Sequence, residues 1–218
     1  MSLLVWIKIC GLTNIEDAKL VVSLGADALG FIFAASKRKV SPEKVREIIS
    51  ALPPGGERIG VFVDEKKDKI RQIAEFCGLT GLQFHGSETS EYCRDFINDN
   101  YQVTKAFRVD ERRGWDEVIP HVRQKAVNRI LLDTFVSDIY GGTGKVFPWN
   151  LIPKARRSWS GIPFIIAGGL NPDNVAEAIK EGDPSGIDVG SGVEKEPGKK
   201  DEEKLRILIS RVRKIGDR

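Results

Sequence analysis

The sequence contains few of the residues that build metal centres and disulfide frameworks. Its 218 residues include three cysteines and two histidines, with neither a Cys-x-x-Cys pair nor a His-x-x-x-His pair. The widely spaced Cys10, Cys77 and Cys93 therefore support neither a zinc site nor a disulfide framework. Unpaired thiols fit a reducing compartment, and we expect a cytoplasmic protein.

Long apolar runs and blocks of like charge are also missing. The longest apolar run, Ala28 to Ala35, is far too short to span a bilayer, and Met1 to Val5 lacks the basic region of a signal peptide. The net charge is +3, without a long Lys/Arg block. Neither a membrane nor a nucleic acid is therefore an expected partner, whereas a pI near 8.7 suits a small anionic substrate.

Several catalytic and nucleotide-binding motifs fail on inspection. A G-x-G-x-x-G motif that begins at Gly190-Ser191-Gly192 would need its third glycine at the position of Lys195. A P-loop ending at Gly144-Lys145 would need glycine in place of Ile139 and Ser or Thr in place of Val146. A G-x-S-x-G nucleophile elbow does not occur.

What the sequence does contain is a regular alternation of short apolar runs and longer amphipathic runs. The predicted strands are Leu4–Ile9, Ala28–Phe33, Arg58–Val63, Gly81–Phe84, Gln102–Phe107, Arg129–Leu132, Phe164–Ala167 and Gly186–Val189. The predicted helices are Asn14–Leu24, Pro42–Ala51, Lys66–Phe76, Glu88–Asn98, Gly114–Arg123, Trp149–Arg157, Asn171–Lys180 and Asp201–Lys214. These β–α units average about 27 residues, within the range of a (β/α)8 TIM barrel, an α/β fold.

No linker or change of composition marks a second domain, so residues 1–218 are expected to form one barrel domain. An open, doubly wound sheet is the structural alternative, but the regular units show no break in strand order.

Local signals mark the expected helix ends. Thr13 and Glu16 have the spacing of a capping box, and Ser41-Pro42 and Asn171-Pro172 each combine a capping residue with Pro at the first helical position. Glycines stand just past three expected helix ends, at Gly25, Gly78 and Gly182.

In a parallel barrel the strand-to-helix loops gather at one face, where chemistry is done. Cys10 ends the first strand at this face. It could act as a base or nucleophile, or it could be a small apolar residue that closes a layer of the barrel. Asp133 ends the sixth strand, where it could act as a general acid or could cap the following loop. Both interpretations stay open for each residue.

Two further side chains and two glycine turns lie at the same face. Arg38 could hold a carboxylate or belong to a solvated basic loop, and His85 could transfer a proton or orient a neighbour. Gly168-Gly169 and Gly190-Ser191-Gly192 follow strands seven and eight, where barrels bind phosphate; simple tight turns are the alternative. The long, glycine-rich loop from Thr134 to Pro148 is expected to be a lid.

A series of segments, in order along nearly the whole chain, carries a family resemblance. They are Lys8–Asn14, Gly25–Ala28, Ser36–Arg38, Gln83–Gly86, Leu131–Thr134, Gly141–Gly144, Gly168–Pro172, Asp188–Glu194 and Pro197–Asp201. Together they resemble the phosphoribosylanthranilate isomerases, (β/α)8 enzymes of tryptophan biosynthesis.

The resemblance implies an Amadori rearrangement of N-(5-phosphoribosyl)anthranilate, without cofactor or metal. It implies that Cys10 is the general base and Asp133 the general acid, and that Arg38 holds the anthranilate carboxylate. The turns at Gly168-Gly169 and Ser191-Gly192 would hold the phosphate. A different sugar-phosphate isomerase and a non-catalytic phosphosugar-binding barrel are the alternatives, the latter disfavoured by the presence of both Cys10 and Asp133.

Overall fold

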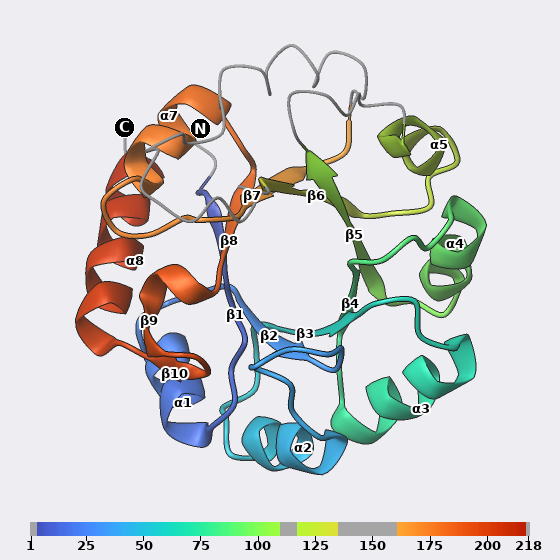
Figure 1. Ribbon diagram of the computed structural model, residues 1–218, viewed down its shortest axis with the longest axis horizontal. Helices are drawn as coiled ribbons and strands as arrows, with labels where there is room; N and C mark the ends of the chain where they lie inside the picture. Colours follow the sequence, from blue (N-terminus) through green and yellow to red (C-terminus); the bar gives the residue numbers. More distant parts are fainter. Residues whose placement is uncertain (1–3, 110–116, 135–160, 217–218) are drawn as a thin grey trace.

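Eight parallel strands form a closed barrel at the centre of the molecule (Figure 1). The computed structural model describes residues 4–109, 117–134 and 161–216. The strands are β1 (Trp6–Cys10), β2 (Ala28–Ile32), β3 (Glu57–Phe62), β4 (Gly81–Phe84), β5 (Gln102–Val109), β6 (Arg129–Thr134), β7 (Phe164–Ala167) and β8 (Gly186–Val189). The predicted barrel is confirmed, and its closure excludes the open sheet.

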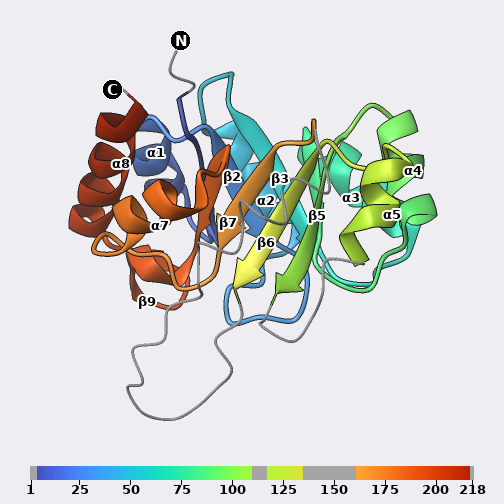
Figure 2. The ribbon, with the colours of Figure 1, turned by 90° about the horizontal axis from the view of Figure 1, so that it is seen from above.

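The barrel closes because β1 pairs with the second strand and with the last. Ile9 of β1 lies opposite Leu29 of β2 on one side and opposite Val189 of β8 on the other. All neighbouring strands are parallel, so their carboxyl ends meet at one mouth. In Figure 2 the arrowheads of β5 and β6 point down towards this mouth.

Helices surround the barrel on the outside (Figure 1). Those described are α1 (Ile15–Ser23), α2 (Pro42–Ser50), α3 (Lys67–Cys77), α4 (Ser90–Asn98), α5 (Val118–Arg123), α7 (Val175–Gly182) and α8 (Glu202–Gly216). Between β8 and α8 the chain forms a 3-10 turn, η3 (Ser191–Val193), and a hairpin of β9 (Glu194–Glu196) and β10 (Lys199–Lys200). The predicted helix Trp149–Arg157, residues 135–148 of the predicted lid loop and Gly114 lie outside the described residues, whereas Thr134 ends β6.

The start of α1 differs from the predicted capping box. Asn14 is the N-cap, and its side-chain oxygen accepts a hydrogen bond from the Asp17 N–H at 2.8 Å. The Thr13 hydroxyl instead donates to the carbonyl oxygen of Gly198 at 2.5 Å. The capping-box prediction is therefore wrong, because a tertiary contact with the β9–β10 hairpin engages Thr13.

The two ends of α7 also differ from the prediction. The Asn171 side chain accepts from the Asp173 N–H at 2.8 Å within a turn, and the helix begins only at Val175. At the other end Gly182 is still helical, and Asp183 adopts the left-handed conformation with φ 46°. An aspartate can take this conformation at a modest cost, so the predicted glycine was not needed there.

Side chains of the strands alternate between the helix layer and the barrel interior, as the period of two requires. In β1, Ile7 and Ile9 are fully buried in the large core beneath the helices. Trp6 points the other way and packs on a small apolar layer inside the barrel, formed by Ala106, Leu131, Ile165 and Ala167. By the same alternation, Lys8 and Cys10 point into the interior, nearer the mouth.

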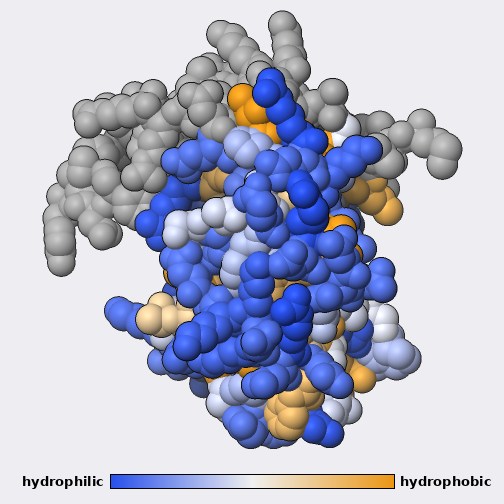
Figure 3. Space-filling view, turned by 90° about the vertical axis from the view of Figure 1, so that its right-hand side faces the viewer, coloured by the Kyte–Doolittle hydropathy of each residue, from blue (hydrophilic) through white to orange (hydrophobic). Residues whose placement is uncertain are grey.

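The outer surface is largely polar. The side of the molecule that lies on the right in Figure 1 is mainly hydrophilic, with apolar residues scattered in small groups (Figure 3). Among the described helices, none is long and apolar enough to cross a bilayer.

Candidate active site

A pocket of about 200 Å³ opens at the mouth of the barrel. Its lining includes Cys10, His85, Asp133, Gly168, Gly169, Asp188, Gly190, Ser191 and Gly192. These residues lie on or directly after β1, β4, β6, β7 and β8, although they are up to 182 residues apart in sequence. The pocket thus brings together every predicted site residue except Arg38.

One side of the pocket carries a hydrogen-bonded acid and imidazole. His85 Nε2 lies 3.1 Å from Asp133 Oδ2, and the two side chains are 22% and 25% exposed. Asp133 follows the buried Leu132 directly, so β6 delivers its carboxyl group to the pocket rim. The arrangement fits the orienting role that was one of the two predictions for His85.

The other side of the pocket carries Cys10 above a buried polar cluster. Inside the barrel, the Lys8 ammonium donates to Asp188 Oδ2 at 2.8 Å and to Gln83 Oε1 at 2.9 Å. Each of these three side chains is at most 8% exposed. Burial raises the pKa of the Cys10 thiol, and the charge of Lys8 opposes that rise.

Arg38 lies beside this pocket and is already paired. Its Nε donates to Glu194 Oε1 at 2.8 Å and its Nη2 to Oε2 at 2.6 Å, a bidentate ion pair. Its aliphatic stem crosses Gly11, where a Cβ would lie 2.6 Å from Arg38 Cδ. Within the described ranges, Arg38 Nη1 makes no hydrogen bond, so that edge of the guanidinium can take a second acceptor.

Hydrogen bonds of Lys200 connect the β9–β10 hairpin to the mouth of the barrel. Its fully buried ammonium donates to the carbonyl oxygens of Cys10 at 2.6 Å and Gly190 at 3.1 Å, and to Glu194 Oε1 at 3.0 Å. Burial lowers the pKa of Lys200, and Glu194 opposes that change. One ammonium therefore fixes the ends of β1 and β8 relative to the carboxylate that holds Arg38.

The glycine turns differ in what they tolerate. A Cβ on Gly192 would lie 1.8 Å from the carbonyl oxygen of Leu170, so the two turns pack against each other without room for a side chain. A Cβ on Gly169, where φ is 67°, would have no atom within 4 Å, so the pocket side is open. The turns therefore leave backbone groups accessible on the pocket floor, as an anion site requires.

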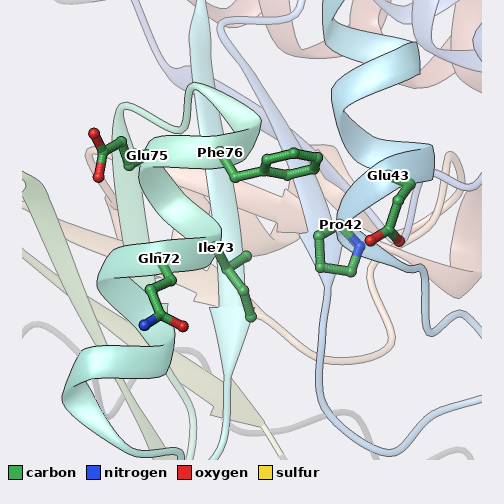
Figure 4. A pocket seen from close by; sticks show the side chains of 6 residues that line it. All are labelled: Pro42, Glu43, Gln72, Ile73, Glu75 and Phe76. Atoms are coloured by element: carbon green, nitrogen blue, oxygen red, sulfur yellow. The ribbon is translucent and has the colours of Figure 1, made fainter.

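Larger pockets in the described part of the chain lack this combination of residues. A pocket of about 670 Å³ shares His85 with the mouth and runs past the buried Glu88–Lys105 ion pair. A cleft of about 550 Å³ lies between α2 and α3, where Ile73 and Phe76 face Pro42 (Figure 4). The latter is on the helix layer, away from the carboxyl ends of the strands.

The sequence interpretation assigned no role to four charged residues of the site. Lys8 lies in a predicted strand of mostly apolar residues, and Asp188, Glu194 and Lys200 lie in segments that carry the family resemblance. A charged residue within a strand buried on both faces is the signal that could have singled out Lys8 and Asp188.

The closed barrel and the chemistry of its mouth define a (β/α)8-barrel enzyme. A family model described as N-(5'-phosphoribosyl)anthranilate (PRA) isomerase matches residues 7–211. The N-(5'-phosphoribosyl)anthranilate isomerase of Desulforudis audaxviator is 45% identical over 207 residues, which cover 95% of this chain and 97% of that protein.

Solved structures agree with the sequence comparison. The phosphoribosyl anthranilate isomerase of Thermotoga maritima is 42% identical, with a TM-score of 0.84 over 95% of this chain and 98% of the other. A phosphoribosyl anthranilate isomerase in complex with reduced 1-(o-carboxyphenylamino)-1-deoxyribulose 5-phosphate is 40% identical, with a TM-score of 0.81 and the same coverage. This chain belongs to the N-(5'-phosphoribosyl)anthranilate isomerase family, so the family resemblance inferred from the ordered motifs is confirmed.

Proposed function

We propose that this chain converts N-(5'-phosphoribosyl)anthranilate to 1-(2-carboxyphenylamino)-1-deoxyribulose 5-phosphate in tryptophan biosynthesis. The observation that carries the proposal is the pocket at the mouth, whose lining includes Cys10, Asp133 and the glycine turns that follow β7 and β8. Family membership supports the substrate, because a related isomerase binds a reduced form of this product.

In the proposed reaction Asp133 is the general acid. Its carboxyl group protonates the furanose ring oxygen as the C–O bond breaks, and a Schiff base forms with the anthranilate nitrogen. The hydrogen bond of 3.1 Å to His85 orients the carboxyl group towards the pocket. His85 is thus assigned to positioning and substrate binding.

Cys10 is the proposed general base. Its thiolate removes the proton from C2 of the Schiff base to give an enolamine, which tautomerises to the ketone. Asp188 lines the pocket, and its buried Oδ1 has no hydrogen-bond partner among the described residues. It is therefore an acceptor for a sugar hydroxyl close to the base.

The two anionic ends of the substrate are assigned to separate places. The phosphate is assigned to the backbone N–H groups of the Gly168-Gly169 and Ser191-Gly192 turns. The carboxylate is assigned to the Nη1 edge of Arg38, since Glu194 occupies the Nε and Nη2 edge. Glu194 would keep the guanidinium in place while the substrate uses its remaining donors.

We further propose that residues 1–218 act as one catalytic domain in the cytoplasm. Pairing of β1 with β8 joins both ends of the chain into one barrel, which supports the single domain. The free thiols of Cys10, Cys77 and Cys93 support a reducing compartment. A small phosphosugar is the proposed partner, with neither nucleic acid nor membrane.

A turnover assay with the purified chain tests the proposed function. Phosphoribosylanthranilate generated in situ should be consumed, and the carboxyphenylamino deoxyribulose phosphate should appear in equal amount. Cys10→Ser and Asp133→Asn serve as controls for catalysis by the protein. Turnover of a different phosphosugar alone would favour another isomerase, and tight substrate binding without turnover would favour a binding protein.

A further inference from the structure

Lys8 is a buried charge for which the proposed reaction has no direct use. Among the described residues it is one of the largest fully buried side chains, with 1% exposure, and it lies in the interior of the barrel below the pocket. Removing an ammonium from water is costly, and a hydrophobic replacement of similar volume often serves stability as well or better. Its presence at this position therefore calls for an explanation beyond packing.

The contacts of Lys8 leave one donor for the thiol. An ammonium has three N–H groups, and here two are directed to Asp188 and Gln83. Lys8 and Cys10 are two residues apart on β1, so both side chains are on the same face of the strand. The third N–H is thus available to the sulfur.

The neighbouring strand leaves room for the two side chains to meet. A Cβ on Gly30 of β2 would lie 2.8 Å from Cys10 Sγ and 2.9 Å from Lys8 Cε. Because Gly30 has no side chain, the stem of Lys8 and the sulfur of Cys10 can both lie against the backbone at this position.

We propose that Lys8 is a positioning residue whose buried ammonium stabilises the thiolate of Cys10 and so prepares it to remove the substrate proton. The proposal rests on the proposed function for the role of the thiolate in turnover. Its electrostatic part concerns the free protein and can be tested without substrate.

The charges around Cys10 act in opposing directions. Burial raises the pKa of the thiol most strongly; Lys8 of β1 and Lys200 of β10 lower it, and Asp188 of β8 raises it. Arg38, from the loop after β2, also interacts with the thiolate, and His85 and Asp133 face it across the pocket. The cations therefore offset part of the desolvation cost, and without them the pKa of the Cys10 thiol would lie higher still.

Lys8 itself stays charged at neutral pH. Burial alone would lower its pKa, but the Asp188 carboxylate and the Cys10 thiolate reverse this effect and raise it above its ordinary value. Lys8 is therefore a fixed positive charge rather than a proton donor or acceptor in the reaction.

The test is the pH dependence of iodoacetamide alkylation at Cys10, followed by peptide mass spectrometry. In Lys8→Met the midpoint should move up by at least about one pH unit, so alkylation is about tenfold slower at a fixed lower pH. In Asp188→Asn the midpoint should move down, because a negative charge is removed. Cys77 and Cys93, with pKa values raised by burial to about 11 and about 12, are internal references.

A matched control removes a different buried ammonium. Lys105→Met deletes a lysine that is 3% exposed and lies 3.3 Å from Glu88, on β5. It should leave the alkylation midpoint of Cys10 unchanged. An equal shift in Lys105→Met and Lys8→Met would overturn the proposal, as would an unchanged midpoint in folded Lys8→Met.

A double variant covers the case in which Lys8→Met fails to fold with Asp188 unpaired. Lys8→Met/Asp188→Asn leaves neither charge behind, and because Lys8 affects the thiol more strongly than Asp188, the midpoint should still rise. A lowered or unchanged midpoint in this variant would overturn the proposal.

Activity provides a second, separate readout. The rising limb of kcat against pH should move to higher pH in Lys8→Met, so that the loss of kcat shrinks as the pH is raised. A loss independent of pH would show a structural role. Absence of any turnover in the parent protein would contradict the proposed function but leave the alkylation result intact.

Discussion

The surroundings of the proposed base, Cys10, and of the proposed acid, Asp133, differ strongly between the two sides of the barrel mouth. Cys10 adjoins Lys8, Asp188 and Lys200, all nearly or fully buried and all in ion pairs. Asp133, on the opposite side, is about a quarter exposed, and it is hydrogen-bonded to His85, which is equally open. The charges beside Cys10 are buried and paired, whereas the hydrogen bond of Asp133 is partly exposed.

The difference matches what an acid and a base need. A thiolate inside a protein is unfavourable unless positive charges replace the lost water, so the base side must be built from buried cations. A general acid has to regain its proton after each turnover, which is faster where solvent reaches the carboxyl group. If the proposed roles hold, buried charges control the protonation of the base, and solvent access controls how the acid regains its proton.

Removing either reacting group should have the largest effect. We expect Cys10→Ser and Asp133→Asn each to lower kcat by at least about a hundredfold, the usual scale of general acid–base catalysis. Substrate should still bind, because the proposed phosphate and carboxylate contacts remain. Single-turnover kinetics with binding measured separately is the check, and a Cys10→Ser enzyme with most of its kcat would return Cys10 to a packing role.

The double variant sharpens the comparison between the two sides. Because both residues serve one turnover, Cys10→Ser/Asp133→Asn should be much less than multiplicatively worse than either single variant. Fully multiplicative losses would show that the two sides act independently.

Removing Arg38 should weaken the recognition of one substrate group. Arg38→Ala should lose about 2 kcal/mol of transition-state stabilisation, roughly thirtyfold in kcat/KM. An analogue without the anthranilate carboxylate should be nearly indifferent to the change. Lys37→Ala, an exposed residue in the same loop, is the control; equal losses on both substrates would place Arg38 in a purely structural role.

Neutralising Glu194 should alter stability at acidic pH. Burial alone would raise the pKa of this carboxyl, but Arg38 and Lys200 reverse the effect and lower it. Its contribution is thus present above the unfolded pKa of about 4.3 and is lost as the pH falls below that value. Glu194→Gln should be about 1 to 2 kcal/mol less stable at pH 7, and this difference should shrink in acid.

Urea unfolding at pH 7 and at acidic pH measures that difference. Glu196→Gln is the matched control, because this residue of the same hairpin is 66% exposed and lies 3.9 Å from Lys199. It should change the free energy of unfolding by less than about 0.5 kcal/mol. A constant Glu194→Gln difference across the pH range would contradict the assigned ion pairing.

The smallest effect is expected at the phosphate turn. Gly169→Ala should cost about 1 kcal/mol in stability because of its positive φ, and should raise KM several-fold by crowding the anion. Gly192 is unsuitable for this test, since its Cβ would collide with the Leu170 backbone. An unchanged KM in Gly169→Ala would remove the phosphate from this turn.

Most of the fold could be predicted because it is encoded locally. The observed β4, β7 and β8 have the predicted bounds, and the other strands differ by a few residues at their ends. Helix ends were harder to predict, because Thr13 is engaged by Gly198, which is 185 residues away along the chain. Capping rules consider only neighbours within one turn and cannot include such a contact.

The candidate site divides in the same way. Local patterns in the chain set the alternation of strands and helices, and therefore which residues come to the mouth: Cys10, His85, Asp133 and the glycine turns each follow a recognisable strand. The variants above test whether these residues work there as proposed.

The pairing of charges, by contrast, is set by the three-dimensional arrangement. Lys8 pairs with Asp188 across 180 residues, Arg38 with Glu194 across 156, and Lys200 reaches the Cys10 carbonyl across 190. The reason is physical: periodicity reports which side of an element is buried, whereas an ion pair depends on the register of β1 against β8 and on the path of the hairpin, which are set by closure of the barrel.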